Sequence, residues 1–267
     1  MTIPDFQKIV WGYYCEHGRH ELLWRQDVTP YKIIVSEIML QQTQVSRVSQ
    51  KFPEFLATFP DFESLSKASL VEVLTQWQGL GYSRRAKFLH QTAKTILADF
   101  DGKIPLDTQT LSTLPGIGEN TAGAILAYSY NLPTVFIETN IRRIFIHHFF
   151  PNQDKVSDKD LLPIIADSLD KNNSREWYWA LMDYGSHLKQ KIPNPNKRSA
   201  NYSVQSRFEG SNRQVRAMIL KSLLERPKNI LEIAEIFEET ETRIHQNISD
   251  LIKEGFVELK DNYFSIV

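Results

Sequence analysis

The feature that most constrains the fold is a helical periodicity of apolar residues, which dominates the chain from end to end. Thr29-Pro30 is typical of a cap followed by proline at the first helical position, and predicts a helix from Pro30 through about Gln44. Continuous strand patterns are almost absent until the last dozen residues, so the sequence predicts an all-α fold. Short breaks rich in proline, glycine, aspartate or asparagine separate the further apolar segments, which are Phe52–Phe59, Ser64–Gln78, Arg84–Phe100, Thr108–Leu114, Thr121–Tyr130, Thr139–Phe149, Asp158–Leu169 and Ser174–Gln190.

The pattern changes near residue 190. Lys191–Arg207 is polar, contains two prolines and has little periodicity, which predicts a linker or a surface loop. An Asp261-Asn262 turn inside Phe256–Val267 then predicts a terminal β-hairpin. Before it, three short helices are predicted over Gln214–Leu224, Ile230–Phe237 and Thr240–Lys253. This element order predicts a small winged-helix-like module, and we expect a domain over 1–190, a linker over 191–207 and a module over 208–267.

Composition bounds the class of protein. The 267 residues suffice for one large domain and a small one, and the formal net charge of −1 gives no global basic field. The N-terminal residues lack a signal pattern, and no run of about 18 apolar residues occurs, so we expect a cytoplasmic protein, a monomer with no membrane partner. Cys15 is the single cysteine, which excludes an internal disulfide and a four-cysteine metal site within the chain.

A glycine motif lies between two short helical segments. In Leu114-Pro115-Gly116-Ile117-Gly118, the two glycines permit a tight turn and close backbone approach. The next helix then presents free amides, which can bind a phosphate oxygen without a basic side chain. An ordinary turn between packed helices is the alternative, although the small residues of Ala122–Ala124 favour close helix packing and the DNA-binding interpretation.

At this point the chain resembles a known family. From about Phe6 to Leu188, roughly two-thirds of the chain, it is similar to the MutY adenine glycosylases and more loosely to the endonuclease III superfamily. The motifs that carry the resemblance stand in the family order: LLWRQDVTPYKIIVSEIMLQQTQV, WQGLGYSRRAKFLH, LPGIGENTAGAIL, ETNIRRIF and ALMDYGSHL. The resemblance implies a helix–hairpin–helix DNA glycosylase fold of two helical subdomains with the site in the cleft between them. It also implies base flipping from double-stranded DNA that carries a mismatch or a damaged base.

The resemblance assigns the DNA contacts. Gln41 and Gln42 match the residues that enter the opened base stack, and Tyr82 matches the aromatic wedge at the lesion. A solvated helix face is the alternative for the glutamines, and a core aromatic is the alternative for Tyr82. Such hairpins also often hold a monovalent cation through backbone carbonyls of the loop; no other metal is expected.

Glu37 is the expected general acid. It shares a helix face with the apolar residues Ile33 and Leu40, so its charged form is disfavoured and its pKa raised, as a general acid requires. It also coincides with the acid that protonates adenine in MutY. Glycosidic cleavage passes through an oxocarbenium-like state, for which a second carboxylate is the natural partner.

Glu138 is the candidate for that second carboxylate, where the family has aspartate. Its side chain is one methylene longer, which leaves three outcomes open: a site rebuilt around Glu138, a slower enzyme or an inactive one. An N-terminal cap for the helix from Thr139 is an alternative role. Asn140 keeps the family pattern and is the expected partner in aligning water.

The reaction type follows from Asn120. Bifunctional members carry a lysine there that attacks the sugar and forms a Schiff base, which asparagine cannot do. The resemblance therefore implies a monofunctional hydrolase that uses water.

The base pocket departs from the family at one position. Trp24 and Arg25 match residues that line the purine pocket, but Trp179 stands where adenine-specific members carry Gln or Glu to read the base edge. Trp179 can equally be core packing. We expect release of adenine opposite guanine or 8-oxoguanine. Release of thymine or uracil from mismatches is the alternative, and so is a catalytically silent, structure-specific DNA-binding protein.

The family's iron–sulfur cluster has no ligands here. The four cysteine positions, by spacing from the ALMDYGSHL motif, are Lys189, Asn196, Ser199 and Gln205 in this chain, so we expect no cluster and no other cofactor. Lys189 and Arg198 belong to a basic run that can contact the DNA backbone or simply be solvated. In place of a larger C-terminal domain the chain has the winged-helix candidate, whose helix over Thr240–Lys253 mixes both charges. For this module, docking against the glycosylase domain is at least as well supported as recognition of the base opposite the target.

Overall fold

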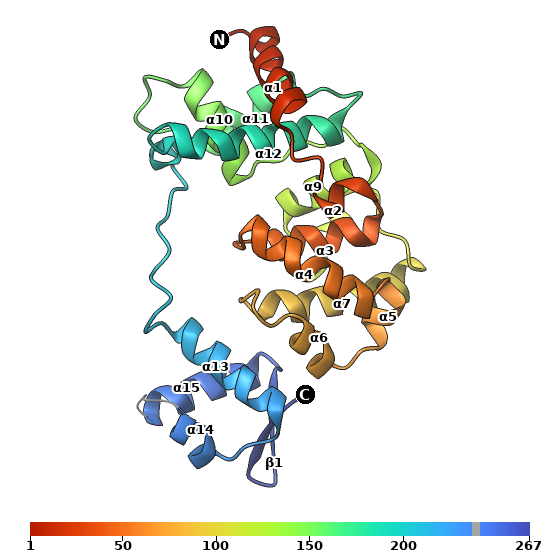
Figure 1. The fold of residues 1–267 in the computed structure, drawn as a ribbon, viewed down its shortest axis with the longest axis vertical. Helices are drawn as coiled ribbons and strands as arrows, with labels where there is room; N and C mark the ends of the chain where they lie inside the picture. The colour runs from red at the N-terminus through yellow and green to blue at the C-terminus, as the bar shows by residue number, and fades with distance from the viewer. Residues whose placement is uncertain (237–240) are drawn as a thin grey trace. The chain divides into compact units, whose positions relative to one another are not determined.

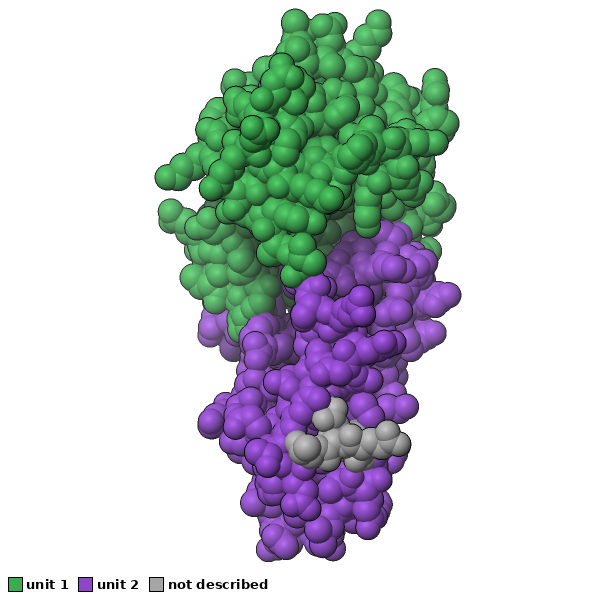
Figure 2. Space-filling model, turned by 90° about the vertical axis from the view of Figure 1, so that its left-hand side faces the viewer, with its two compact units in different colours: residues 1–38, 104–204 green, residues 39–103, 205–267 purple. Residues whose placement is uncertain are grey.

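A computed structural model describes residues 1–236 and 241–267. The described chain forms two compact units, each built from two separated segments, shown in different colours in Figure 2. Unit 1 contains residues 1–38 and 104–204, and unit 2 contains residues 39–103 and 205–267. The predicted domain boundaries at 190 and 207 therefore stay a prediction. Within the described ranges, no helix is both long and apolar enough to span a bilayer.

Unit 1 is helical throughout its described secondary structure, as Figure 1 shows. Helix α12 packs against α1, α9 and α10, and this contact forms the core of the unit. The ring of Phe6 lies 5.0 Å from that of Phe145 and 6.0 Å from that of Trp177. The elements of the unit are α1 (Ile3–His17), α2 (Leu23–Gln26), α3 (Pro30–Leu40, which ends in unit 2), α8 (Thr108–Leu111), α9 (Glu119–Tyr130), α10 (Thr139–Phe149), α11 (Asp158–Ser168), α12 (Ser174–Lys191) and a short 3₁₀ helix, η1 (Pro195–Arg198).

Unit 2 combines four helices of its first segment with the C-terminal elements. The ring of Phe55 packs against those of Phe59 and Trp77, and α7 packs against α5 and α6. Helix α13 contacts α6. The elements are α4 (Val45–Thr58), α5 (Phe62–Lys67), α6 (Leu70–Gln76), α7 (Arg84–Phe100), α13 (Asn212–Glu225), α14 (Ile230–Ile236), α15 (Glu241–Lys253), β1 (Val257–Lys260) and β2 (Tyr263–Ile266).

Local signals explain where α3 begins and ends. The Thr29 hydroxyl accepts a hydrogen bond from the Lys32 amide at 3.3 Å, and Pro30 opens the helix as predicted. The predicted end at about Gln44 is wrong, because the helix stops at Leu40 and Gln42 adopts a left-handed φ of 55°.

Two other helices differ from the predicted pattern. The single segment predicted over Ser64–Gln78 is two helices, because Ala68 is extended and Ser69 forms a capping box with Glu72 that starts α6. Helix α1 was not predicted, although Thr2 caps it and its buried face resembles those of the other helices.

The C-terminal elements follow the predicted order. The hairpin pairs Val257 with Ile266 and turns at Asp261 and Asn262, whose φ values of 48° and 65° match a type I′ turn. An isolated antiparallel bridge joins Lys228 to Phe264. The winged-helix-like order of three helices and a hairpin is confirmed; the predicted helix ends at Phe237 and Thr240 lie outside the described residues.

Candidate active site and DNA-contact residues

Two carboxylates come together in unit 1. Glu37 lies on α3, and Glu138 is the N-cap residue that directly precedes α10. Burial raises the pKa of Glu37 well above its ordinary value, and the negative charge of Glu138 raises it further, while Arg25 opposes both. Burial raises the pKa of Glu138 to about 7, against an opposing effect of Arg142. Both carboxyls therefore hold their protons more tightly than free carboxyls do, and the charge of Glu138 adds to this effect at Glu37, which suits a proton donor beside a second carboxyl.

The backbone that carries Glu138 is fixed by Asn120. The side-chain oxygen of Asn120 accepts a hydrogen bond from the Ile137 amide at 3.0 Å. Glu138 stands at the N-cap position, but its side chain makes no capping hydrogen bond. Its carboxylate is therefore not used by the helix end, and Asn120 acts on the backbone one residue before it.

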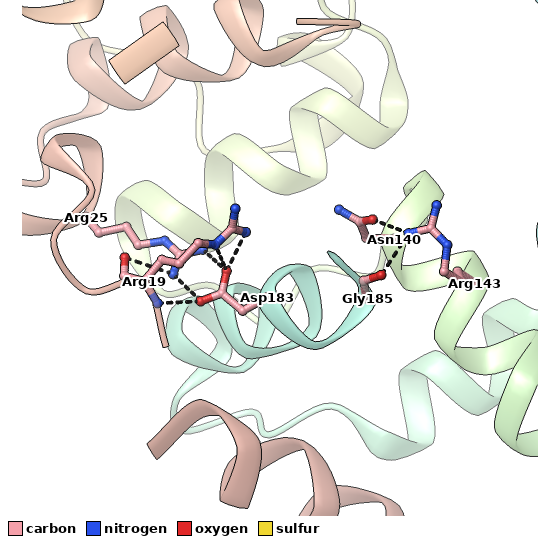
Figure 3. A network of polar contacts seen from close by, with 6 residues as sticks. All are labelled: Arg19, Arg25, Asn140, Arg143, Asp183 and Gly185. Carbon is pink, nitrogen blue, oxygen red and sulfur yellow. Dashed lines mark hydrogen bonds and ion pairs between the residues drawn. The ribbon is translucent and has the colours of Figure 1, made fainter. Parts of the chain in front are cut away.

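Asn140 is held by two neighbours, which Figure 3 shows. Its side-chain oxygen accepts a hydrogen bond from Nη1 of Arg143 at 2.5 Å, and the same nitrogen donates to the Gly185 carbonyl at 2.8 Å. A Cβ at Gly185 would lie 2.7 Å from the Asn140 carbonyl oxygen, so α12 approaches α10 this closely only with glycine at that position.

Arg25 is anchored by Asp183, also drawn in Figure 3. Its two terminal nitrogens donate to the two carboxylate oxygens of Asp183 at 2.8 and 2.9 Å. The Arg19 amide donates to the same carboxylate at 2.8 Å. Burial alone would raise the pKa of Asp183, but the hydrogen bonds and charge of Arg25, with those of Arg19, lower it. Asp183 therefore stays ionised and holds Arg25 in place, and the positive charge of Arg25 acts to lower the pKa of Glu37.

A stack of two aromatic rings lies beside Arg25. Its guanidinium carbon lies 5.3 Å from the centre of the Trp179 ring. That ring stacks on Tyr128 at 6.0 Å with an interplanar angle of 15°, and Trp24 is buried in the same unit. Burial raises the pKa of Tyr128 well above 10, and the charges of Glu37 and Glu138 raise it further. Tyr128, like Asp183, was missed by sequence reasoning, because a tyrosine in a helix that also carries Tyr130 gives no local signal of a functional site.

The hairpin joins α8 to α9. Gly116 has a φ of 76°, which requires glycine, and Leu114 is buried beneath the turn. Gly118 stands at the N-cap of α9 with an ordinary φ of −92°, and a Cβ there would meet no atom within 4 Å. Neither backbone strain nor internal packing thus requires Gly118. Its role in phosphate binding, and a cation at the loop carbonyls, stay predictions.

The predicted wedge residues lie in unit 2. Gln42 and Tyr82 both have left-handed φ values, 55° and 50°, which are uncommon for residues with a side chain. Gln42 is exposed, and Tyr82 and Gln41 are half-buried. The buried Arg85 joins the two turns, since its guanidinium donates to the Met39 carbonyl at 2.8 Å and to the Leu80 carbonyl at 3.0 Å.

The loop that replaces the cluster ligands is tied to α10. The Asn196 side chain donates to the Thr139 carbonyl at 3.0 Å. Arg198 donates to carbonyls at the other end of α10 and just beyond, namely Ile146, Phe150, Pro151 and Gln153. Lys189 is exposed in the last turn of α12, and Cys15 is exposed on α1. These residues do not fit a four-cysteine cluster, and the structure shows Arg198 bound to backbone; DNA contact by Lys189 and Arg198 stays a prediction.

Known proteins resemble the chain at the level of sequence. A family model described as "HhH-GPD superfamily base excision DNA repair protein" matches residues 35–163. The adenine DNA glycosylase of Buchnera aphidicola subsp. Baizongia pistaciae is 36% identical over 187 residues, 70% of this chain and 53% of that protein. That of Mycolicibacterium smegmatis is 32% identical over 240 residues, 84% of this chain and 81% of that protein. The chain spans about half the length of the first relative and four fifths of the second.

The fold is also shared with a solved structure. A non-covalent endonuclease III–DNA complex superposes with a TM-score of 0.62 at 15% identity, covering 72% of this chain and 90% of that one. This likeness confirms the all-α helix–hairpin–helix fold expected from the sequence. The match to the Mycolicibacterium smegmatis protein, which spans 84% of this chain and 81% of that one, shows that the chain, which matches the HhH-GPD model over residues 35–163, belongs to the adenine DNA glycosylase family.

Proposed function

We propose that this protein is a monofunctional DNA glycosylase, which flips a mispaired base out of double-stranded DNA and hydrolyses its N-glycosidic bond. The substrate is adenine opposite guanine or 8-oxoguanine. The observation that carries the proposal is the pairing of Glu37 and Glu138 in unit 1, two carboxyls whose pKa values are both raised by burial. The names of the relatives and the DNA in the endonuclease III complex support the same substrate class.

The chemistry divides between the two carboxyls. Glu37 donates its proton to the base as the bond between C1′ and the base nitrogen breaks, and the bonding electrons leave with the base. The ionised Glu138 stabilises the positive charge left on the sugar. Water, aligned beside Asn140, adds its oxygen to C1′, and the one proton that it releases returns through solvent to Glu37. The products are the free base and an abasic site.

The position of Asn120 supports hydrolysis over strand cleavage. An amide cannot form a Schiff base with the sugar, and this one accepts a hydrogen bond from the Ile137 amide. We therefore expect abasic sites that are cut only after alkali, and no covalent complex on treatment with borohydride. A covalent complex would contradict a monofunctional mechanism.

No iron–sulfur cluster enters the proposal. The polar loop around Asn196 and Arg198 is hydrogen-bonded to both ends of α10, the helix that directly follows Glu138. We expect protein purified with a chelator to keep its full activity. Loss of activity that added iron restores would contradict this.

Mismatch thymine or uracil is the second candidate substrate, because of Trp179. An indole has one hydrogen-bond donor and no acceptor. The ring of Trp179 stacks on that of Tyr128 and also lies beside the guanidinium of Arg25. Trp179 therefore lacks the amide or carboxylate that would read the edge of adenine.

A panel of duplexes tests the proposal. Each carries one mismatch or lesion and is scored for alkali-sensitive sites with wild-type protein and with Glu37→Gln, Glu138→Gln and Glu138→Asp. We expect adenine release by the wild type, loss of about 100-fold or more in Glu37→Gln and Glu138→Gln, and substantial activity in Glu138→Asp, which restores the family carboxylate. Release of pyrimidines alone would replace adenine with the second candidate. No release from any duplex would refute a glycosylase and favour a binding protein.

A further inference from the structure

The predicted wedge, Tyr82, is held by a residue of the C-terminal segment. Nη1 of Arg213, on α13, donates a hydrogen bond to the Tyr82 hydroxyl at 2.6 Å. The guanidinium carbon of Arg213 lies 5.7 Å from the centre of the tyrosine ring, and that of Arg85 lies 5.5 Å from it. Nη2 of Arg213 also donates to the Ser206 carbonyl at 2.7 Å, which fixes the arginine itself. Two guanidiniums thus define where the aromatic ring points.

Gln205 links both predicted DNA-opening residues. Its side-chain amide donates to the side-chain oxygen of Gln42 at 2.9 Å and also contacts the hydroxyl of Tyr82. One side chain of the C-terminal segment therefore bridges two turns that are 40 residues apart in the sequence.

The backbone of these turns is fixed independently. Gln42 and Tyr82 hold strained left-handed conformations, and Arg85 ties their turns together through the Met39, Leu80 and Gly81 carbonyls. With the backbone held, the remaining freedom of the wedge is the orientation of its side chains, which Gln205 and Arg213 contact directly.

The C-terminal segment is itself docked beside Tyr82. The Glu254 carboxylate pairs with Arg84, in the first turn of α7, and with Arg216 on α13, both at 2.5 Å. The Arg84 and Arg216 contacts lower the pKa of Glu254 although burial would raise it. The ammonium of Lys87 donates to the carbonyls of Glu254 and Gly255, and a Cβ at Gly255 would lie 2.7 Å from it. Both ends of this contact lie in unit 2.

We propose that Gln205 and Arg213 are positioning residues for DNA opening, which hold Gln42 and Tyr82 in the orientation that enters the duplex. The C-terminal segment then acts on the lesion through the wedge. This inference rests on the proposed function for its biological meaning, but the contact between the two segments can be measured without DNA.

The first measurement is ¹⁹F NMR of protein labelled with 3-fluorotyrosine, in which Tyr82→Phe identifies the resonance of Tyr82. Arg213→Ala and Gln205→Ala should each shift this resonance. Arg226→Ala is the matched control, because Arg226 pairs with Glu232 inside the C-terminal segment and leaves Tyr82 untouched. Circular dichroism checks that every variant folds. An unmoved Tyr82 resonance in both variants would overturn the proposed contact.

The second measurement is opening of the duplex, followed by the fluorescence of 2-aminopurine placed beside adenine opposite 8-oxoguanine. Loss of a charge-assisted hydrogen bond of this kind changes an equilibrium constant roughly tenfold. Arg213→Ala and Tyr82→Phe should each reduce the opening constant by at least about that factor, and the loss in the double variant should be smaller than the product of the two single losses, because both remove the same hydrogen bond. Arg213→Lys, which keeps the charge, should recover part of the loss.

Other outcomes separate the two proposals. Additive losses in the double variant, wild-type opening in Arg213→Ala, or no opening by the wild type would each overturn the positioning role. Increased opening in Arg213→Ala would overturn it too, since the contact would then restrain the wedge. If opening depends on Arg213 but no base is released from any duplex, the positioning role stands and the glycosylase proposal fails.

Discussion

Replacing Glu138 with glutamine should stabilise the fold while removing activity. Burial raises the pKa of this carboxyl from 4.5 to about 7, so folding disfavours its charged form. Because the pKa is higher in the folded protein, the contribution of Glu138 to stability is fully present below pH 4.5 and is lost as the pH rises through about 7. Glutamine has nearly the same shape and carries no charge at any pH.

The magnitude follows from the difference between the two pKa values. At 1.36 kcal/mol per pH unit, a pKa of about 7 in place of 4.5 corresponds to roughly 3 kcal/mol of lost stability above pH 7. Glu138 is only half-buried, so solvent screening reduces this, and we expect a gain of about 1 to 2 kcal/mol for Glu138→Gln at pH 8. Removing its charge also relieves Glu37, which adds in the same direction.

Urea unfolding at a series of pH values measures the effect. The free energy of unfolding of Glu138→Gln should equal that of the wild type near pH 4 and exceed it increasingly up to pH 8. Glu21→Gln, at an exposed carboxylate of the same unit, is the control and should give no such trend. A gain that is independent of pH, or a loss at pH 8, would refute the electrostatic reasoning.

Three further substitutions test how the site is held. Gly185→Ala would place a Cβ 2.7 Å from the Asn140 carbonyl oxygen. It should lower the free energy of unfolding in urea by about 1 to 3 kcal/mol and reduce activity. Unchanged stability and activity would show that α10 and α12 can move apart without cost. Arg198→Ala removes the donors to four carbonyls at and just beyond the end of α10, and should lower the free energy of unfolding by about 2 kcal/mol. Substitution of the exposed neighbouring residue, Lys197→Ala, should leave the free energy of unfolding unchanged. Asn120→Ala removes the acceptor for the Ile137 amide, one residue before Glu138. We expect the free energy of unfolding to fall by about 1 kcal/mol and the single-turnover rate of base release to fall as well, and a wild-type rate would contradict a positioning role for Asn120.

Local signals made much of the fold predictable. Helices α7 and α10 have the predicted bounds, because breaks in the apolar pattern and turn residues mark both of their ends. The Asp261-Asn262 turn was predictable for the same reason, since its φ values suit these residues. The split between α5 and α6 was missed because the apolar periodicity continues across Ser69, and only the capping box breaks the helix.

The site was predictable where a residue acts through its own neighbourhood. Glu37 stands on an apolar helix face that by itself raises a pKa. In contrast, the partner of Arg25 is Asp183, 158 positions away, and that of Tyr82 is Arg213, 131 positions away. No periodicity or spacing encodes such pairs, because they arise only when distant helices pack.

The interleaved make-up of the two units bears on how the chain reaches its folded state. Residues 39–103 pack among themselves through α5, α6 and α7 and are joined in their unit by residues 205–267, whereas residues 1–38 share a unit with residues 104–204. Neither unit can be completed early in synthesis, and each requires a long loop to close before its native contacts form. We therefore expect nascent chains to expose apolar helix faces of the first segment of each unit until its second segment has been made.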